Sequence, residues 1–247
     1  MLNVAPRKHY RHSPIQEAVC EFEFPDVAKW DIGFSNRMFD AMHSFYPVQP
    51  QALPPDAATG GEHGHGPKVR LSTLDAKWQV RCGESALSIH ELGPYQGWET
   101  FHERVHHALR TFLNVAAPKT IAQINLRYRN AFIIQIQSLA MADYFRLGAT
   151  IPHGLPTRLI SYANAFRAAY DDEPRTVLSL SFTATPSPHD AKAGVEATLD
   201  VMTSAIQLSE PAEIEFLLKK AGDLKVRAYE AFESVITDHT RKLLGKV

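Results

Sequence analysis

Residues 17–24 alternate between two kinds of side chain, and this alternation constrains the fold more than any other feature of the sequence. A period of two is typical of a β-strand with one buried and one solvent-facing side. Such a strand needs neighbouring strands and a layer that covers its apolar side. The apolar side carries Ala18, Cys20, Phe22 and Phe24, and the other side carries Glu17, Val19, Glu21 and Glu23.

The rest of the sequence predicts two series of elements in the same order: strand, helix, three strands, helix. The first series is a strand over 12–25, a helix over 31–46, a loop rich in Pro and Gly over 48–68, extended runs over 69–74, 77–82 and 86–92, and a helix over 98–113. The second is a strand over 120–137, a short helical piece over 141–147, extended runs over 160–170, 176–185 and 195–205, and a long helical region over 211–244.

This order predicts an α+β fold, an antiparallel sheet with long helices packed on one face. The chain would form a single domain over 1–247 that contains two pseudo-repeated halves, about 12–115 and 119–247. Residues 1–11 are expected to be a flexible tail. Pro211 suits the first turn of the last helical region, and Gly222 would mark a kink in it.

The first long helix contains His102-Glu103-Arg104-Val105-His106, which has the spacing of a zinc-hydrolase motif. Two His ligands one turn apart could hold Zn²⁺, and the Glu would act as the general base. Both His residues, however, lie at the edge of the apolar stripe, and Arg104 would be costly to desolvate in a cleft. The favoured interpretation is a solvated helix flank, with no metal and no cofactor. His63 and His65, in the Gly-rich loop, could bind metal only loosely.

The strand over 120–137 is unusual because its polar side carries Asn125, Arg127 and Arg129. Two guanidiniums and an amide on one sheet face could clamp a carboxylate or phosphate, so these three residues are the predicted ligand-binding site. The alternative is cross-strand pairing with the acidic side of the first strand, formed by Glu17, Glu21 and Glu23.

Composition narrows the class of protein further. The net charge of −1 gives no global field for a polyanion, so nucleic acid is not expected as a direct target. Cys20 and Cys82 fit neither a disulfide framework nor a metal spacing. No apolar run is long enough to cross a membrane, and the N-terminus has no signal-peptide pattern, so a cytoplasmic protein is expected.

Four stretches carry a family resemblance: HSPIQEAVCEFEF, YQGWETF, INLRYRNAF and LKVRAYEAFESVITDHTRKLL. In order and spacing they resemble a sporadically distributed family of uncharacterised bacterial proteins of about this length. The resemblance runs from residue 12 to the end and is weakest over the loop at 49–68. It implies a cytoplasmic bacterial or archaeal protein with no established activity, and it supplies no catalytic residues. By analogy, the sporadic distribution implies accessory or defence-type work beside a protein partner.

The favoured function is therefore a non-catalytic binding or protein-interaction protein, with a protein partner or self-association. One alternative is a metal-dependent hydrolase that uses His102, Glu103 and His106. Another is a small-ligand carrier with a cavity between sheet and long helix, lined by residues such as Phe166, Phe182 and Phe232.

Overall fold

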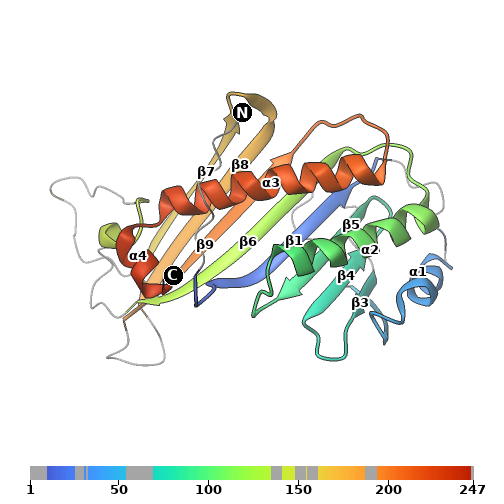
Figure 1. The fold of residues 1–247 in the computed structure, drawn as a ribbon, viewed down its shortest axis with the longest axis horizontal. Coiled ribbons are helices and arrows are strands. Elements are labelled where there is room, and N and C mark those ends of the chain that lie inside the picture. The colour runs from blue at the N-terminus through green and yellow to red at the C-terminus, as the bar shows by residue number, and fades with distance from the viewer. Residues whose placement is uncertain are drawn as a thin grey trace.

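The computed structural model describes most of the chain and shows one nine-stranded antiparallel sheet (Figure 1). The strand order is β2-β3-β4-β5-β1-β6-β9-β8-β7. The described residues are 10–25, 31, 33–53, 69–134, 141–147, 154, 161–186 and 194–245. The strands are β1 (Ile15–Glu23), β2 (Val48–Ala52), β3 (Val69–Ser72), β4 (Trp78–Cys82), β5 (Ala86–Leu92), β6 (Gln123–Ile134), β7 (Tyr162–Tyr170), β8 (Glu173–Pro186) and β9 (Val195–Ala205). The helices are α1 (Phe34–Met42), α2 (Trp98–Ala116), α3 (Ile214–Val235) and α4 (Asp238–Leu243), with a 3-10 turn at Met141–Asp143.

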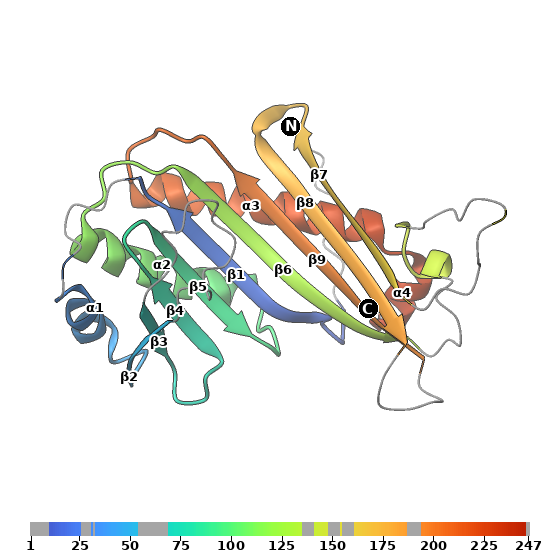
Figure 2. The same ribbon diagram turned by 180° about the vertical axis from the view of Figure 1, so that it is seen from behind.

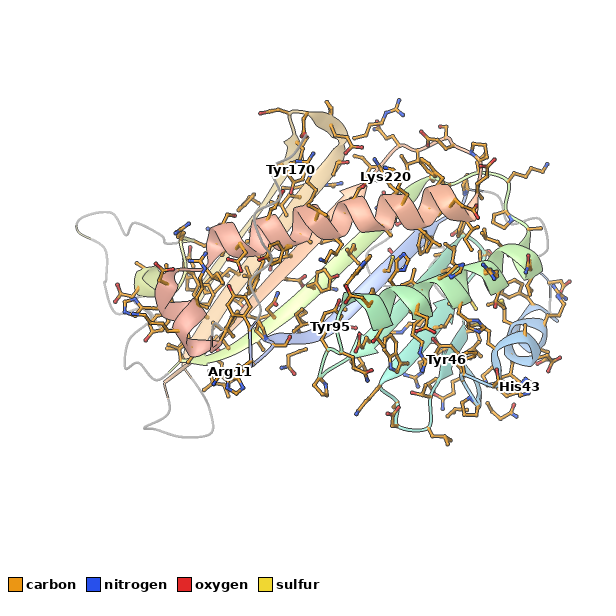
Figure 3. The ribbon with its side chains drawn as sticks, viewed as in Figure 1. Arg11, His43, Tyr46, Tyr95, Tyr170 and Lys220 are labelled. Carbon is orange, nitrogen blue, oxygen red and sulfur yellow. The ribbon has the colours of Figure 1, made fainter. Side chains whose placement is uncertain are left out.

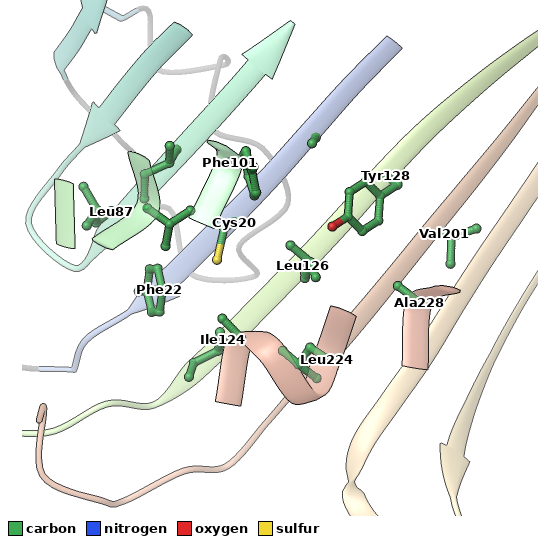
Figure 4. Close-up of a cluster of buried hydrophobic side chains, with 14 of the residues drawn as sticks. Cys20, Phe22, Leu87, Phe101, Ile124, Leu126, Tyr128, Val201, Leu224 and Ala228 are labelled. Atoms are coloured by element: carbon green, nitrogen blue, oxygen red, sulfur yellow. The ribbon is translucent and has the colours of Figure 1, made fainter. Parts of the chain in front are cut away.

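The strand with the alternating pattern, β1, lies in the middle of the sheet. It pairs antiparallel with β5 on one side and with β6 on the other, so that Cys20 is opposite both Ile89 and Leu126. All three residues are fully buried, and Figure 4 shows Cys20 and Leu126 in the central hydrophobic cluster. The apolar side of β1 therefore faces the core, as the alternation predicts.

The two long helices supply the other layer of this core. In Figure 1 α2 and α3 lie in front of the strands, and in Figure 2, seen from behind, the strands lie in front of the helices. Helix α2 covers β5 and helix α3 covers β6 and β9. Each buries one stripe of side chains at helical spacing. The stripes are Phe101, Val105, Ala108, Leu109, Phe112 and Ala116 in α2, and Leu217, Ala221, Leu224, Ala228, Ala231 and Val235 in α3.

The structure confirms the predicted α+β class and the antiparallel sheet. Strand β9 has the predicted bounds, and the chain turns at residues 171–172 as expected. The predicted loop at 48–68 is wrong at its start, because β2 occupies Val48–Ala52. Pro50 hid this strand from the sequence pattern, but an edge strand tolerates a proline.

The expectation for the C-terminal end is also wrong. The last helical region begins at Ile214, after Glu213, and it breaks at Ile236–Thr237 instead of kinking at Gly222. The backbone at Ile236 is extended, and this allows α4 to start in a new direction. At the N-terminus the predicted tail is held at its end, because the Arg11 amide donates to the Gly245 carbonyl. Residues 1–9 lie outside the described residues.

Candidate functional site

A cavity of about 450 Å³ lies on the helix side of the sheet, where the start of α2 comes near α3. Its volume falls in the range of pockets that bind small molecules, roughly 300–1,000 Å³. Five segments distant in the sequence form its walls, so only the folded chain contains it. It is lined by Tyr10, Ser13, Pro14, Ile15, Tyr95, Gln96, Gly97, Trp98, Glu99, Tyr128, Asn130, Val201, Lys225, Ala228, Tyr229 and Phe232.

One end of the cavity is the N-terminus of α2. Gly97 caps this helix with φ +110° and ψ +164°, a backbone conformation that is essentially restricted to glycine. No side chain among the described residues caps the helix, and the first-turn N–H groups carry the positive end of the helix dipole. The preceding loop is held by buried Glu91, whose Oε1 accepts a hydrogen bond of 2.7 Å from the Gln96 amide. Figure 3 shows Tyr95 at this end of α2.

The floor of the cavity is formed by β6. The Tyr128 hydroxyl is buried and makes no hydrogen bond of normal geometry with any described residue. The Tyr95 ring lies edge-on to the Tyr128 ring, with 5.8 Å between centroids. Burial and the nearby Tyr95 raise the pKa of Tyr128 well above its usual value, so the phenol is a neutral donor. In Figure 4 Tyr128 is seen with Val201 and Ala228, which also line the cavity.

Asn130, two residues along β6, is held in a single orientation. Its Nδ2 donates to the main-chain carbonyls of Tyr128 (3.2 Å) and Leu199 (3.0 Å). Both amide protons are therefore used, and Oδ1 remains as the acceptor that this side chain can offer. Together Tyr128 and Asn130 provide one donor and one acceptor in fixed positions.

The opposite wall is aromatic and comes from α3 and the N-terminal segment. Tyr10 packs edge-on against Phe232, with 6.5 Å between ring centroids, and the Tyr10 hydroxyl donates to Glu233. The Lys225 ammonium lies 5.9 Å from the centre of the Tyr229 ring. Flat, rigid rings of this kind favour a flat ligand over a flexible aliphatic chain.

The predicted site on the other face of the sheet is largely occupied by internal pairs. Asn125 donates to Glu21 (3.0 Å) and Glu23 (3.3 Å) on β1, so the alternative of cross-strand pairing is correct for this residue. Arg127 binds both carboxylate oxygens of Asp200 on β9. Arg129 is exposed, and no described residue forms an ion pair with it. The three residues share one face, but two of them already have partners.

The same face contains a hydrogen-bond chain that the sequence did not reveal. Ser88 Oγ lies 3.0 Å from His90 Nε2, and His90 Nδ1 lies 3.1 Å from Glu17 Oε1. This is the order of a serine–histidine–carboxylate triad. Burial lowers the pKa of His90, and the hydrogen bond from His90 lowers the pKa of Glu17. Ser88 is 0% exposed, however, so its hydroxyl is not open to a substrate, and the chain serves to join β1 to β5.

The zinc-like motif on α2 has the geometry of a helix flank. Glu103 is exposed, and His102 and His106 are half-buried. His106 Nε2 lies 2.8 Å from an Arg110 nitrogen, and the His102 ring lies 5.3 Å from the Trp98 ring. In the part of the chain that the structure describes, no three His, Cys, Asp or Glu side chains are grouped to hold a metal ion. His63 and His65 lie outside the described residues.

The cavity proposed from the sequence had the right location but mostly the wrong residues. Phe232 lines it. Phe182 is instead part of the closed core, packed against Phe145 and Tyr162. Phe166 is 43% exposed on β7, away from the cavity. The signal that could have found the site is Tyr128, a polar-tipped residue on the apolar side of its strand, together with the Gly97 that starts α2.

Comparison with known proteins adds no assignment. No protein-family model matches the sequence, and no curated protein is significantly similar to it. Among the described residues, no helix is long and apolar enough to cross a membrane.

Proposed function

We propose that this chain is a non-catalytic binding protein that holds a small, flat ligand in the cavity between α2 and α3. The observation that carries the proposal is the Tyr128 hydroxyl, which is buried at the cavity wall and makes no hydrogen bond of normal geometry with a described residue. Leaving a buried donor unpaired costs about 1–3 kcal/mol, and folded proteins rarely accept that cost without a reason. A ligand with an acceptor atom at this position would remove the cost.

The side chains that line the cavity indicate the class of ligand. Aromatic side chains from β6, α2 and α3 favour an aromatic or heteroaromatic ring system. Tyr128 would donate to an oxygen or ring nitrogen of the ligand, and Asn130 Oδ1 would accept from an N–H or O–H group. The open N–H groups of α2 and the Lys225 ammonium favour partial negative charge on the ligand at the helix end, although Glu99 in the first turn limits full anionic charge.

Native mass spectrometry of protein purified gently from its own cells tests the proposal. We expect a mass equal to the chain plus a small molecule, and the molecule should leave on denaturation and absorb in the near ultraviolet. Tyr128→Phe should lose the bound molecule, whereas Tyr144→Phe, which changes a tyrosine that does not line the cavity, should keep it. The bare chain mass, together with no binding of indole, benzoate or adenine that depends on Tyr128, would contradict the proposal.

The same proposal includes the packing of the long helices and the relation between the two halves of the chain. We propose that the long helices pack on one face and that the two halves are pseudo-repeats, each a central strand flanked by three more. The strand order supports this, since it runs β1-β5-β4-β3 outward on one side, with the additional short strand β2 at its edge, and β6-β9-β8-β7 on the other. The cavity would then lie at the junction of the halves. We also propose a cytoplasmic bacterial protein, in keeping with two buried, unbonded cysteines.

A further inference from the structure

Strand β7 forms one edge of the sheet and is open to solvent along most of its length. It has nine residues, Tyr162–Tyr170, and it pairs with β8 on one side only. No described residue pairs with its outer edge. Charged side chains are one way to protect an exposed edge strand, yet Arg167 is the only charged residue in β7. An open edge presents unpaired N–H and C=O groups that can accept another strand.

The other edge of the sheet shows how this protein protects a strand. Strand β2 is short, contains Pro50 and has an irregular register with β3 between Val48 and Gln51. Each feature blocks the addition of a further strand. In β7 there is no proline, and the register irregularity lies at the very end, between Ala169 and Tyr170. The β2 edge of the sheet is therefore protected against strand addition by features that β7 lacks.

The sequence of β7 is close to self-complementary about its centre. It reads YANAFRAAY, with Phe166 as the fifth of nine residues. In an antiparallel pair of two such strands centred on Phe166, tyrosines meet tyrosines at the ends, Ala163 faces Ala169, and Asn164 faces Ala168. Arg167 of each copy faces Ala165 of the other, so no like charges are opposed.

We propose that β7 is a self-association surface, on which two copies of this chain pair antiparallel about a two-fold axis at Phe166. A two-fold interface uses the same patch on both copies, which is what a self-complementary strand provides. The two Phe166 rings, 43% exposed in the single chain, would pack together across the axis. The two sheets would join into one continuous sheet with no open β7 edge.

Sedimentation velocity over a range of concentrations tests the pairing. We expect the wild-type chain to sediment as a dimer at about 50 µM, a concentration above the dissociation constants of typical stable dimers. Phe166→Glu should give a monomer, because it places two carboxylates face to face across the axis. The matched control is Leu74→Glu, since Leu74 is 85% exposed in the turn between β3 and β4, and this variant should remain a dimer.

Two changes at Ala165 test the register itself. Ala165→Glu places a carboxylate opposite Arg167 of the second copy and should lower the dissociation constant about threefold to tenfold. Ala165→Lys opposes two cations and should raise it by a similar factor. A wild-type monomer at 50 µM, a dimer that survives Phe166→Glu, or equal effects of the two Ala165 changes would each overturn the proposal. Circular dichroism of each variant confirms that the chain is folded.

Discussion

The Nε atom of Arg127 on β6 lies 2.8 and 2.9 Å from the two carboxylate oxygens of Asp200 on β9. The hydrogen bond to Asp200 is also the main cause of the raised pKa of Arg127. This pair joins two neighbouring strands of the second half of the chain, and it gives an internal partner to a residue predicted to bind a ligand.

We therefore expect Arg127→Ala to lower the free energy of unfolding by about 1–2 kcal/mol, because it leaves the mostly buried Asp200 carboxylate unpaired. Arg129→Ala should cost less than about 0.5 kcal/mol, since Arg129 is exposed and has no described ion-pair partner. Urea denaturation of both variants measures the difference. Equal losses would show that the Arg127–Asp200 pair contributes nothing beyond a surface charge.

Tyr128→Phe tests the Tyr128 hydroxyl, which has no hydrogen bond of normal geometry among the described residues, directly in protein stripped of small molecules. Removing a hydrogen-bonded buried hydroxyl usually costs about 1 kcal/mol, whereas removing an unpaired one is neutral or stabilising. We expect the variant to be as stable as the wild type or up to about 1 kcal/mol more stable. A clear loss of stability in a thermal melt would mean that the hydroxyl has a partner within the protein.

The local patterns of the sequence predicted the layers of this fold, and the contacts between distant segments defined the candidate site. The alternation at Glu17–Phe24 predicted β1 and its buried side because successive side chains of a strand point to opposite faces of the sheet. Strand β2 was missed because a proline such as Pro50 is compatible only with a strand at the edge of a sheet, and the sequence does not show which strands lie at an edge. The Ser88–His90–Glu17 chain and the Tyr95–Tyr128 contact depend on which strands and loops are neighbours, and a single sequence does not record that.

Glu91 should make stability depend on pH. Burial raises its pKa to about 7, from 4.5 for a free carboxyl. The folded protein therefore holds this proton more tightly than the unfolded chain does. The resulting stability is fully present below about pH 4.5 and is lost as the pH rises through about 7. Glu21, whose pKa burial also raises to about 7, contributes a similar dependence.

Glu91→Gln isolates the contribution of Glu91, because the amide is neutral at every pH and keeps an acceptor for the Gln96 N–H. The free energy of unfolding is measured by urea denaturation at pH 5 and pH 8. Between these pH values the wild type should lose about 1–3 kcal/mol of stability relative to the variant. Wild-type and variant curves that run parallel would show that Glu91 is already ionised in the folded protein at pH 5.

Two glycines, one that caps α2 and one inside α3, should respond in opposite directions to the same substitution. Gly97 has a positive φ in a region that other residues avoid, so Gly97→Ala should lower the free energy of unfolding by about 1–3 kcal/mol. Gly222 lies inside α3 with open space around its would-be Cβ, so Gly222→Ala should raise it by about 0.5–1 kcal/mol. Urea denaturation compares the two variants. Because Gly97 also sets the direction of α2 at the cavity, only its variant should weaken binding of the small molecule. If Gly222→Ala weakened binding equally, the cavity would depend on the position of α3 more than on the helix start at Gly97.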